Sequence, residues 1–259
     1  MNNIYFVSGG KDSTAMLIRA LEAGDRVDRA IFLDTNLEFP ELYQYLDRVD
    51  NHIAEYGMKI ERVVTSPHSF EHFFYRPHKK GKSEGVIQGF PFVAFSAFCW
   101  IRREFKKFPN PGADDCHHIG IAYDERHRTK RKTYTEEVEC VGCGFFAGTC
   151  TTMVTQTSKH YTFPLIESKM TERDCINFLK ERDLINPLYE YFRRIGCWLC
   201  PYQGKKSLHM LYLKYPQLWA KLLEYERDSP QGFLSDGELN DLSKIFEQRL
   251  KFQQVPLSG

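Results

Sequence analysis

The feature that most restricts the fold is a strand, loop and helix pattern at the start of the chain. The apolar run Ile4–Val7 leads into the loop Ser8-Gly9-Gly10-Lys11-Asp12-Ser13, after which apolar residues recur at helical spacing. Two further strands, Ala30–Leu33 and Ile60–Val64, are separated by a helix that begins at Pro40. Strands that alternate with helices predict a parallel sheet flanked by helices, and they exclude an all-helical or all-β fold.

The rest of the chain divides into an irregular middle and a helical end. We expect a fourth strand near Cys116–Ala122, no strong period from Tyr123 to Ser158, and helices from Ser207 to Phe252. The patterns Thr171-x-x-Asp174 and Ser235-x-x-Glu238 resemble capping boxes, so each is predicted to begin a helix.

Composition limits the class of protein. The chain has 259 residues and a formal net charge of +1, so binding to a polyanion through bulk charge is excluded. No apolar run reaches the roughly 18 residues of a membrane span, and the first residues lack the features of a secretory signal. We therefore expect a cytoplasmic protein without membrane contact. A domain over residues 1–205 with a cysteine-rich insertion is predicted to precede a helical extension over residues 206–259.

The glycine-containing loop is the most specific functional signal. Adjacent Gly9 and Gly10 allow a tight turn, so that backbone N–H groups and the start of the following helix point at one anion. Lys11 adds a positive charge, two serine hydroxyls add donors, and Asp12 offers an oxygen ligand to Mg²⁺. The loop Ser8–Ser13 therefore predicts a pyrophosphate site, and the alternative is an ordinary glycine turn.

The cysteines indicate a metal centre. The chain has eight cysteines, and four of them form the C-x-x-C pairs Cys140/Cys143 and Cys197/Cys200. A reducing cytoplasm disfavours disulfides, whereas two such pairs suit four thiolates around Zn²⁺ or an iron–sulfur cluster. Cys175, on the apolar side of a predicted helix, is expected to be a buried small residue instead.

Four segments resemble one known family. Ser8–Ser13 is similar to the S-G-G-x-D-S loop of the PP-loop ATP pyrophosphatases. Asp34–Pro40 resembles the D-T-x-x-x-F-P signature of their phosphoadenosine phosphosulfate (PAPS) reductase-like branch, and Gly120–Arg128 resembles a further element of that branch. Gly196–Pro201 is similar to the cluster-binding region of the DndC- and SspD-type DNA phosphorothioation ATPases. The resemblance implies an adenine-nucleotide α-hydrolase-like (Rossmann-like) fold.

The resemblance also implies roles for individual residues. Lys11, Asp12 and Arg128 would be catalytic, while Lys106 would face the phosphates or an incoming oxyanion. For Arg128 the alternative is a solvated basic face, and for Asp34 it is a carboxylate that caps a strand end. ATP would be held by Ser8, Gly9, Gly10, Lys11, Asp12, Ser13, Asp34 and Thr35, the last two near the ribose and adenine.

The resemblance and the two C-x-x-C pairs together order the metal ligands. In iron–sulfur reductases of the family the ligands include cysteines at positions that resemble Cys99, Cys197 and Cys200. We therefore expect a [4Fe-4S] cluster, with Zn²⁺ as the alternative. The expected ligands, in order, are Cys197, Cys200, Cys143, Cys140 and Cys99.

Three functions remain open on the sequence. The first is an ATP pyrophosphatase that adenylates a nucleic acid for sulfur incorporation, with DNA favoured over transfer RNA as the acceptor. A cysteine desulfurase would supply the sulfur. The basic segments Lys79–Lys82 and Arg126–Lys132 would hold the polyanion, or they are solvated loops. The second is a sulfonucleotide reductase, which the lack of cysteine after Phe246 disfavours. The third is a regulator that binds nucleotide and metal without turnover.

Overall fold

The chain forms two compact units. A computed structural model describes residues 1–90, 99–106, 109, 111–131, 134–139, 149–154, 160–234 and 237–253. The first unit comprises Met1–Phe32, Leu46–Glu61 and Pro109–Asn186, and the second comprises Leu33–Tyr45, Arg62–Phe108 and Pro187–Gly259. The domain boundary predicted after residue 205 stays a prediction.

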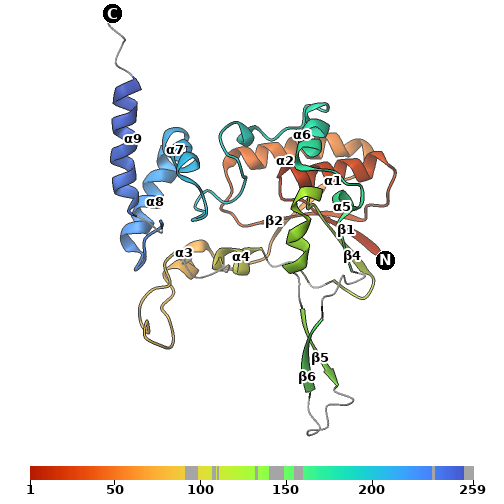
Figure 1. The fold of residues 1–259 in the computed structure, drawn as a ribbon, viewed down its shortest axis with the longest axis horizontal. Coiled ribbons are helices and arrows are strands. Elements are labelled where there is room, and N and C mark those ends of the chain that lie inside the picture. The colour runs from red at the N-terminus through yellow and green to blue at the C-terminus, as the bar shows by residue number, and fades with distance from the viewer. Residues whose placement is uncertain are drawn as a thin grey trace, which may run out of the picture. The chain divides into compact units, whose positions relative to one another are not determined.

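A five-stranded sheet organises the fold (Figure 1). Its strands are β1 (Asn2–Phe6), β2 (Arg29–Asp34), β3 (Ile60–Val64), β4 (Asp115–Ile119) and β7 (Tyr161–Thr162). The order is β3-β2-β1-β4-β7, and the β1–β2, β1–β4 and β4–β7 pairs are parallel. The predicted parallel sheet flanked by helices is confirmed. From β1 the chain continues to β2 and β3 on one side of the sheet, and to β4 and β7 on the other. The strand order therefore reverses between β1 and β4, which is where such sheets bind ligands.

Helices of the first unit begin where the sequence indicates. α1 (Lys11–Glu22) follows the glycine-containing loop and contacts α5 (Pro164–Glu167) and α6 (Glu172–Lys180). Its apolar face is buried because apolar residues recur every three or four positions. At the start of α6, Thr171 and Asp174 form the predicted capping box.

One helix and its following turn match the predicted limits closely. α2 (Pro40–Ile53) begins at the proline, whose fixed φ suits the first helical turn. A short 3-10 turn follows and ends at Gly57, whose φ of 69° lies in the left-handed region that favours glycine.

The second unit is mostly helical, as predicted for the C-terminal part. Its last three helices are α7 (Lys205–Lys214), α8 (Pro216–Asp228) and α9 (Leu239–Gln253), which contact one another. Pro216 separates α7 from α8, a break that the sequence analysis did not predict. Ser235, from the second predicted capping box, lies outside the described residues. No helix within the described ranges is long and apolar enough to cross a membrane.

An aromatic cluster joins the C-terminal helices to the two short helices α3 (Phe70–Phe74) and α4 (Trp100–Phe105). The ring of Phe70 lies 5.4 Å from that of Trp100 and 5.0 Å from that of Tyr225. Such edge and offset contacts between large buried rings stabilise a core beyond their buried area.

A hairpin occupies the stretch that has no clear period in the sequence. β5 (Tyr134–Glu139) and β6 (Thr149–Val154) pair antiparallel, with Cys150 opposite Val138 (Figure 1). Cys140 and Cys143, two of the predicted metal ligands, lie outside the described residues.

Candidate functional site

The loop between β1 and α1 has the geometry of an anion site. Gly9 has a φ of 72°, a left-handed conformation that favours glycine and turns the chain tightly. The backbone N–H of Ser8 donates to Oγ of Ser13 at 3.0 Å, and the two hydroxyls lie 3.0 Å apart. Gly10 is the N-cap of α1 and makes no side-chain hydrogen bond there, and the start of a helix carries a partial positive charge that attracts an anion.

Two residues distant in sequence hold this loop. Nδ2 of Asn186, which is 1% exposed, donates to the carbonyl oxygen of Gly9 at 2.9 Å. Gly120 follows β4 and packs so closely that a Cβ there would lie 2.6 Å from Cα of Ser13. The loop is therefore fixed at the point where the strand order reverses. No local pattern in the sequence indicated the contacts of Asn186 or Gly120.

Three carboxylates meet beside the loop. One oxygen each of Asp12, Glu125 and Glu172 lie within 4.8 Å of one another. Nζ of Lys11 lies 3.0 Å from Asp12 and 2.7 Å from Glu172. Burial raises the pKa of Asp12, although the Lys11 ammonium opposes that shift. Carboxylate oxygens are the ligands that Mg²⁺ prefers, so this donor set fits that ion. Sequence reasoning selected Asp12 and missed the other two carboxylates.

Two predicted residues adjoin this carboxylate cluster. Arg128 forms an ion pair with Glu125 and is partly exposed. Cys175 is completely buried on α6, as predicted. Burial, followed by the charge of Asp12, raises the pKa of the Cys175 thiol to about 12, so this thiol stays protonated.

In the second unit, Asp34 and Thr35 are hydrogen-bonded within their own turn. The carboxylate of Asp34 accepts from the backbone N–H of Asn36 and from the hydroxyl of Tyr43, both at 2.8 Å. Thr35 donates to Oε1 of Glu38 at 3.0 Å. Asp34 thus caps the end of β2 in this structure, and its contact with a nucleotide stays a prediction.

Three thiols and a buried ion pair occur together in the second unit. Nζ of Lys106 lies 3.0 Å from Oε1 of Glu38, whose side chain is 1% exposed. Burial disfavours the Lys106 ammonium, but the charges of Glu38 and of the nearby Cys197 outweigh it and raise the pKa of Lys106. A hydrogen bond from Cys197 lowers the pKa of Cys200 to about 7. Burial, with a smaller effect of Cys200, raises the pKa of Cys99.

The spacing of the three thiols bears on whether they could hold a zinc ion. A Zn²⁺ ion held by three thiolates at about 2.3 Å needs sulfur atoms roughly 3.8 Å apart. Among the described residues only the carboxylate cluster brings three ligand atoms within 4.8 Å, so Cys99, Cys197 and Cys200 do not form a compact zinc site. The choice between zinc and an iron–sulfur cluster therefore stays a prediction.

Fold and loop together define a class of protein: an α/β protein with a glycine-containing loop, shaped like an anion site, at the reversal of its strand order. Residues 2–83 match the sequence model of the phosphoadenosine phosphosulfate reductase domain. The match covers about a third of the chain and includes the loop Ser8–Ser13.

A curated protein is similar over most of the chain. The uncharacterized protein MJ0066 of Methanocaldococcus jannaschii is 28% identical over 240 residues, which are 89% of this chain and 44% of that protein. The chain therefore spans less than half the length of this relative.

Proposed function

We propose that the chain is an ATP pyrophosphatase that adenylates a nucleic-acid acceptor for sulfur incorporation. The acceptor we favour is a DNA backbone phosphate, with transfer-RNA thiolation as a variant. The observation that carries this proposal is the loop Ser8–Ser13, which places the start of α1 and the ammonium group of Lys11 at the reversal of the strand order. The partial positive charge of a helix start beside Lys11 suits the β and γ phosphates of ATP.

The residues around the loop have separable tasks. Lys11 exchanges its contact with Glu172 for a phosphate oxygen when ATP binds, since both partners compete for one ammonium group. Asp12, Glu125 and Glu172 would hold Mg²⁺, which when bound neutralises charge on the phosphates. An acceptor oxygen then bonds to the α-phosphorus of ATP, the bond to the β-phosphate oxygen breaks, and pyrophosphate leaves.

The thiols of the second unit would serve the sulfur step. Cys197, Cys200 and Cys99 would hold an iron–sulfur cluster or pass on sulfur from a cysteine desulfurase. Lys106, whose side chain is 30% exposed, supplies a positive charge that would stabilise thiolates. The outer sulfur of a persulfide on one thiol would attack the activated phosphorus, and AMP would depart with the oxygen. A second thiol would then attack the inner sulfur, which leaves the new P–S bond on the acceptor and forms a disulfide that an external dithiol reduces.

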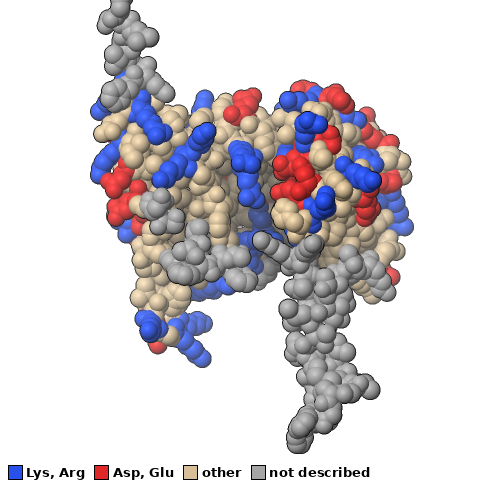
Figure 2. Space-filling model, viewed as in Figure 1, with Lys and Arg blue, Asp and Glu red and all other residues tan. Residues whose placement is uncertain are grey.

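Two exposed basic regions are the candidate nucleic-acid contacts. Figure 2 shows basic side chains gathered at the tip of the loop after α3, and Lys79, Lys80 and Lys82 of this loop are all exposed. In the first unit Arg126 and Arg128 are exposed as well. Clusters of this kind attract phosphate without reading base sequence.

Exchange of labelled pyrophosphate into ATP tests the proposal. We expect exchange that depends on Mg²⁺, and formation of AMP and pyrophosphate that increases when DNA is added. Sulfite release that requires thioredoxin and occurs without ATP cleavage would instead support a sulfonucleotide reductase. Nucleotide binding without either reaction would support a regulator.

A further inference from the structure

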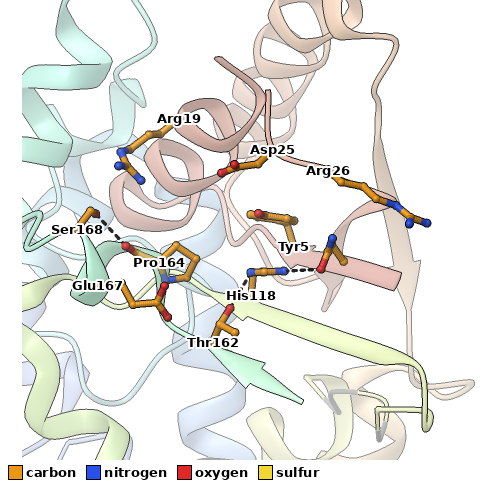
Figure 3. Close-up of a pocket in the computed structure, with 10 residues that line it drawn as sticks. Tyr5, Arg19, Asp25, Arg26, His118, Thr162, Pro164, Glu167 and Ser168 are labelled. Carbon is orange, nitrogen blue, oxygen red and sulfur yellow. Dashed lines mark hydrogen bonds between the residues drawn. The ribbon is translucent and has the colours of Figure 1, made fainter. Parts of the chain in front are cut away.

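The first unit contains a cavity that the loop Ser8–Ser13 does not line. Its volume is about 540 Å³, enough for a small molecule. The lining comes from β1, β4 and β7, from α1 and the turn that follows it, and from α5 (Figure 3). None of the residues assigned above to ATP, Mg²⁺ or sulfur lines it.

The floor of the cavity is aromatic and uncharged. The rings of Tyr5 and His118 stack with centroids 4.1 Å apart and an angle of 11° between planes. The His118 ring nitrogens are already bonded, Nδ1 with Thr162 at 2.7 Å and Nε2 with Asn3 at 3.2 Å. Burial lowers the pKa of His118 to about 4, so the ring is neutral near pH 7. This floor suits an apolar or flat group of a ligand.

The rim carries charges of both signs that the protein itself does not pair. Figure 3 shows Arg19, Asp25 and Glu167 around the space that Tyr5 borders. None of the three has a side-chain hydrogen bond or ion pair within the described part of the chain. Burial raises the pKa of Tyr5 to about 12, and the charges of Asp25 and Glu167 add to that shift. Both carboxylates therefore lie close enough to the Tyr5 ring to influence its hydroxyl.

One further cation on the rim is already engaged. The guanidinium of Arg26 lies 2.8 Å from Asp28, and Nε of Arg26 donates to the same carboxylate at 2.9 Å. The charges open to a ligand are therefore one guanidinium and two carboxylates. A purely anionic ligand would face both carboxylates, and a purely cationic ligand would face Arg19, so neither is well matched.

We propose that this cavity binds a free amino acid with an apolar or aromatic side chain. The carboxylate of the ligand pairs with Arg19, and its ammonium group lies between Asp25 and Glu167. Its side chain rests on the partly exposed ring of His118, against which the buried ring of Tyr5 stacks. The site is separate from the phosphate loop, so the proposal stands whether or not the chain cleaves ATP.

Calorimetric titration of the full chain, without ATP, tests this with three probes that share one ring. L-Phenylalanine carries both charges, 2-phenylethylamine only the positive one, and 3-phenylpropanoate only the negative one. We expect L-phenylalanine to bind at least about tenfold more tightly than either analogue, because each charge-assisted hydrogen bond contributes that much. Equal affinity for the three probes, or no binding of L-phenylalanine, would overturn the proposal.

Variants on the rim locate the binding. Arg19→Gln is expected to weaken the binding of L-phenylalanine about tenfold and to leave the binding of 2-phenylethylamine unchanged. Glu167→Gln is expected to weaken the binding of both. Both side chains lie at the rim, so circular dichroism should show an unchanged fold. Arg26→Gln is the matched control, because that guanidinium is already paired with Asp28, and its affinity for L-phenylalanine should be unchanged. Unchanged affinity in both Arg19→Gln and Glu167→Gln would place the ligand elsewhere.

Discussion

At the scale of single residues, burial and neighbouring charge decide which groups are available for chemistry. Lys11 and Asp12 are adjacent in sequence, yet their environment depends on Glu172, which is distant in the chain. Cys175 and Cys200 are both thiols, but burial raises the pKa of the first to about 12, whereas a hydrogen bond from Cys197 lowers that of the second to about 7. Residue type alone therefore did not distinguish structural from reactive side chains.

Asp12→Asn should separate function from stability. Because burial raises the pKa of Asp12, its charged form costs stability as the pH rises through that pKa in the folded state. Asparagine removes this cost, while Lys11 keeps its contact with Glu172. We expect an unchanged or slightly higher Tm at neutral pH, together with loss of pyrophosphate exchange. Full activity in the variant would contradict the assignment of the loop.

His118 should make stability depend on pH. Its pKa is lowered to about 4 in the fold, so the unfolded chain takes up the proton first as the pH falls. The contribution of neutral His118 to the free energy of unfolding is complete above the unfolded pKa of about 6.5. It is lost as the pH falls from there to about 4. Since the ring is partly exposed, we expect a loss of roughly 1–2 kcal/mol between about pH 7.5 and about pH 5.

His118→Gln supplies the comparison. Glutamine keeps an amide for the partners Asn3 and Thr162 but does not titrate. Urea unfolding at both pH values should show a smaller loss of stability in the variant than in the parent chain. An equal loss in the two proteins would show that other groups cause the acid sensitivity.

At the scale of elements, the site depends on how one strand end meets one helix start. β1 and β4 are paired up to Phe6 and Ile119, so the loops that follow them lie next to each other. Gly120 allows this approach because it has no side chain. The capping box at Thr171 then sets the start of α6, where Glu172 is the first residue.

Gly120→Ala should disturb this junction. The added Cβ would lie 2.6 Å from Cα and 2.8 Å from N of Ser13, and backbone atoms cannot move aside cheaply. We expect a loss of about 1–3 kcal/mol in the free energy of unfolding, and weaker binding of ATP. Gly204→Ala is the control, because nothing lies within 4 Å of the added Cβ, and it should bind ATP normally. Normal ATP binding by Gly120→Ala would show that the close contact is not needed.

At the scale of the whole molecule, the two units carry different chemistry. The first unit contains the loop Ser8–Ser13, the carboxylate cluster and the cavity. The second contains the three described candidate thiol ligands and the buried pair of Lys106 and Glu38. The proposed reaction needs both units, because activation by ATP and delivery of sulfur use different groups.

Metal content tests the second unit in the intact chain. After anaerobic purification we expect bound iron and acid-labile sulfide, and their loss in Cys197→Ser. Cys116→Ser is the matched control, since Cys116 is a buried thiol of β4 in the first unit and should not affect the metal. Stoichiometric zinc without iron would contradict the cluster.

The sequence by itself determined the α/β class, the limits of β3 and α2, the loop Ser8–Ser13 and the capping box at Thr171. These features follow from periodicity, turn residues and caps, which act over a few neighbouring positions. Only the tertiary structure decided that Glu172 meets Lys11, that Asn186 holds Gly9, and that unpaired charges surround a cavity. Those contacts join residues more than 150 positions apart or depend on packing between several elements, and no local pattern encodes them.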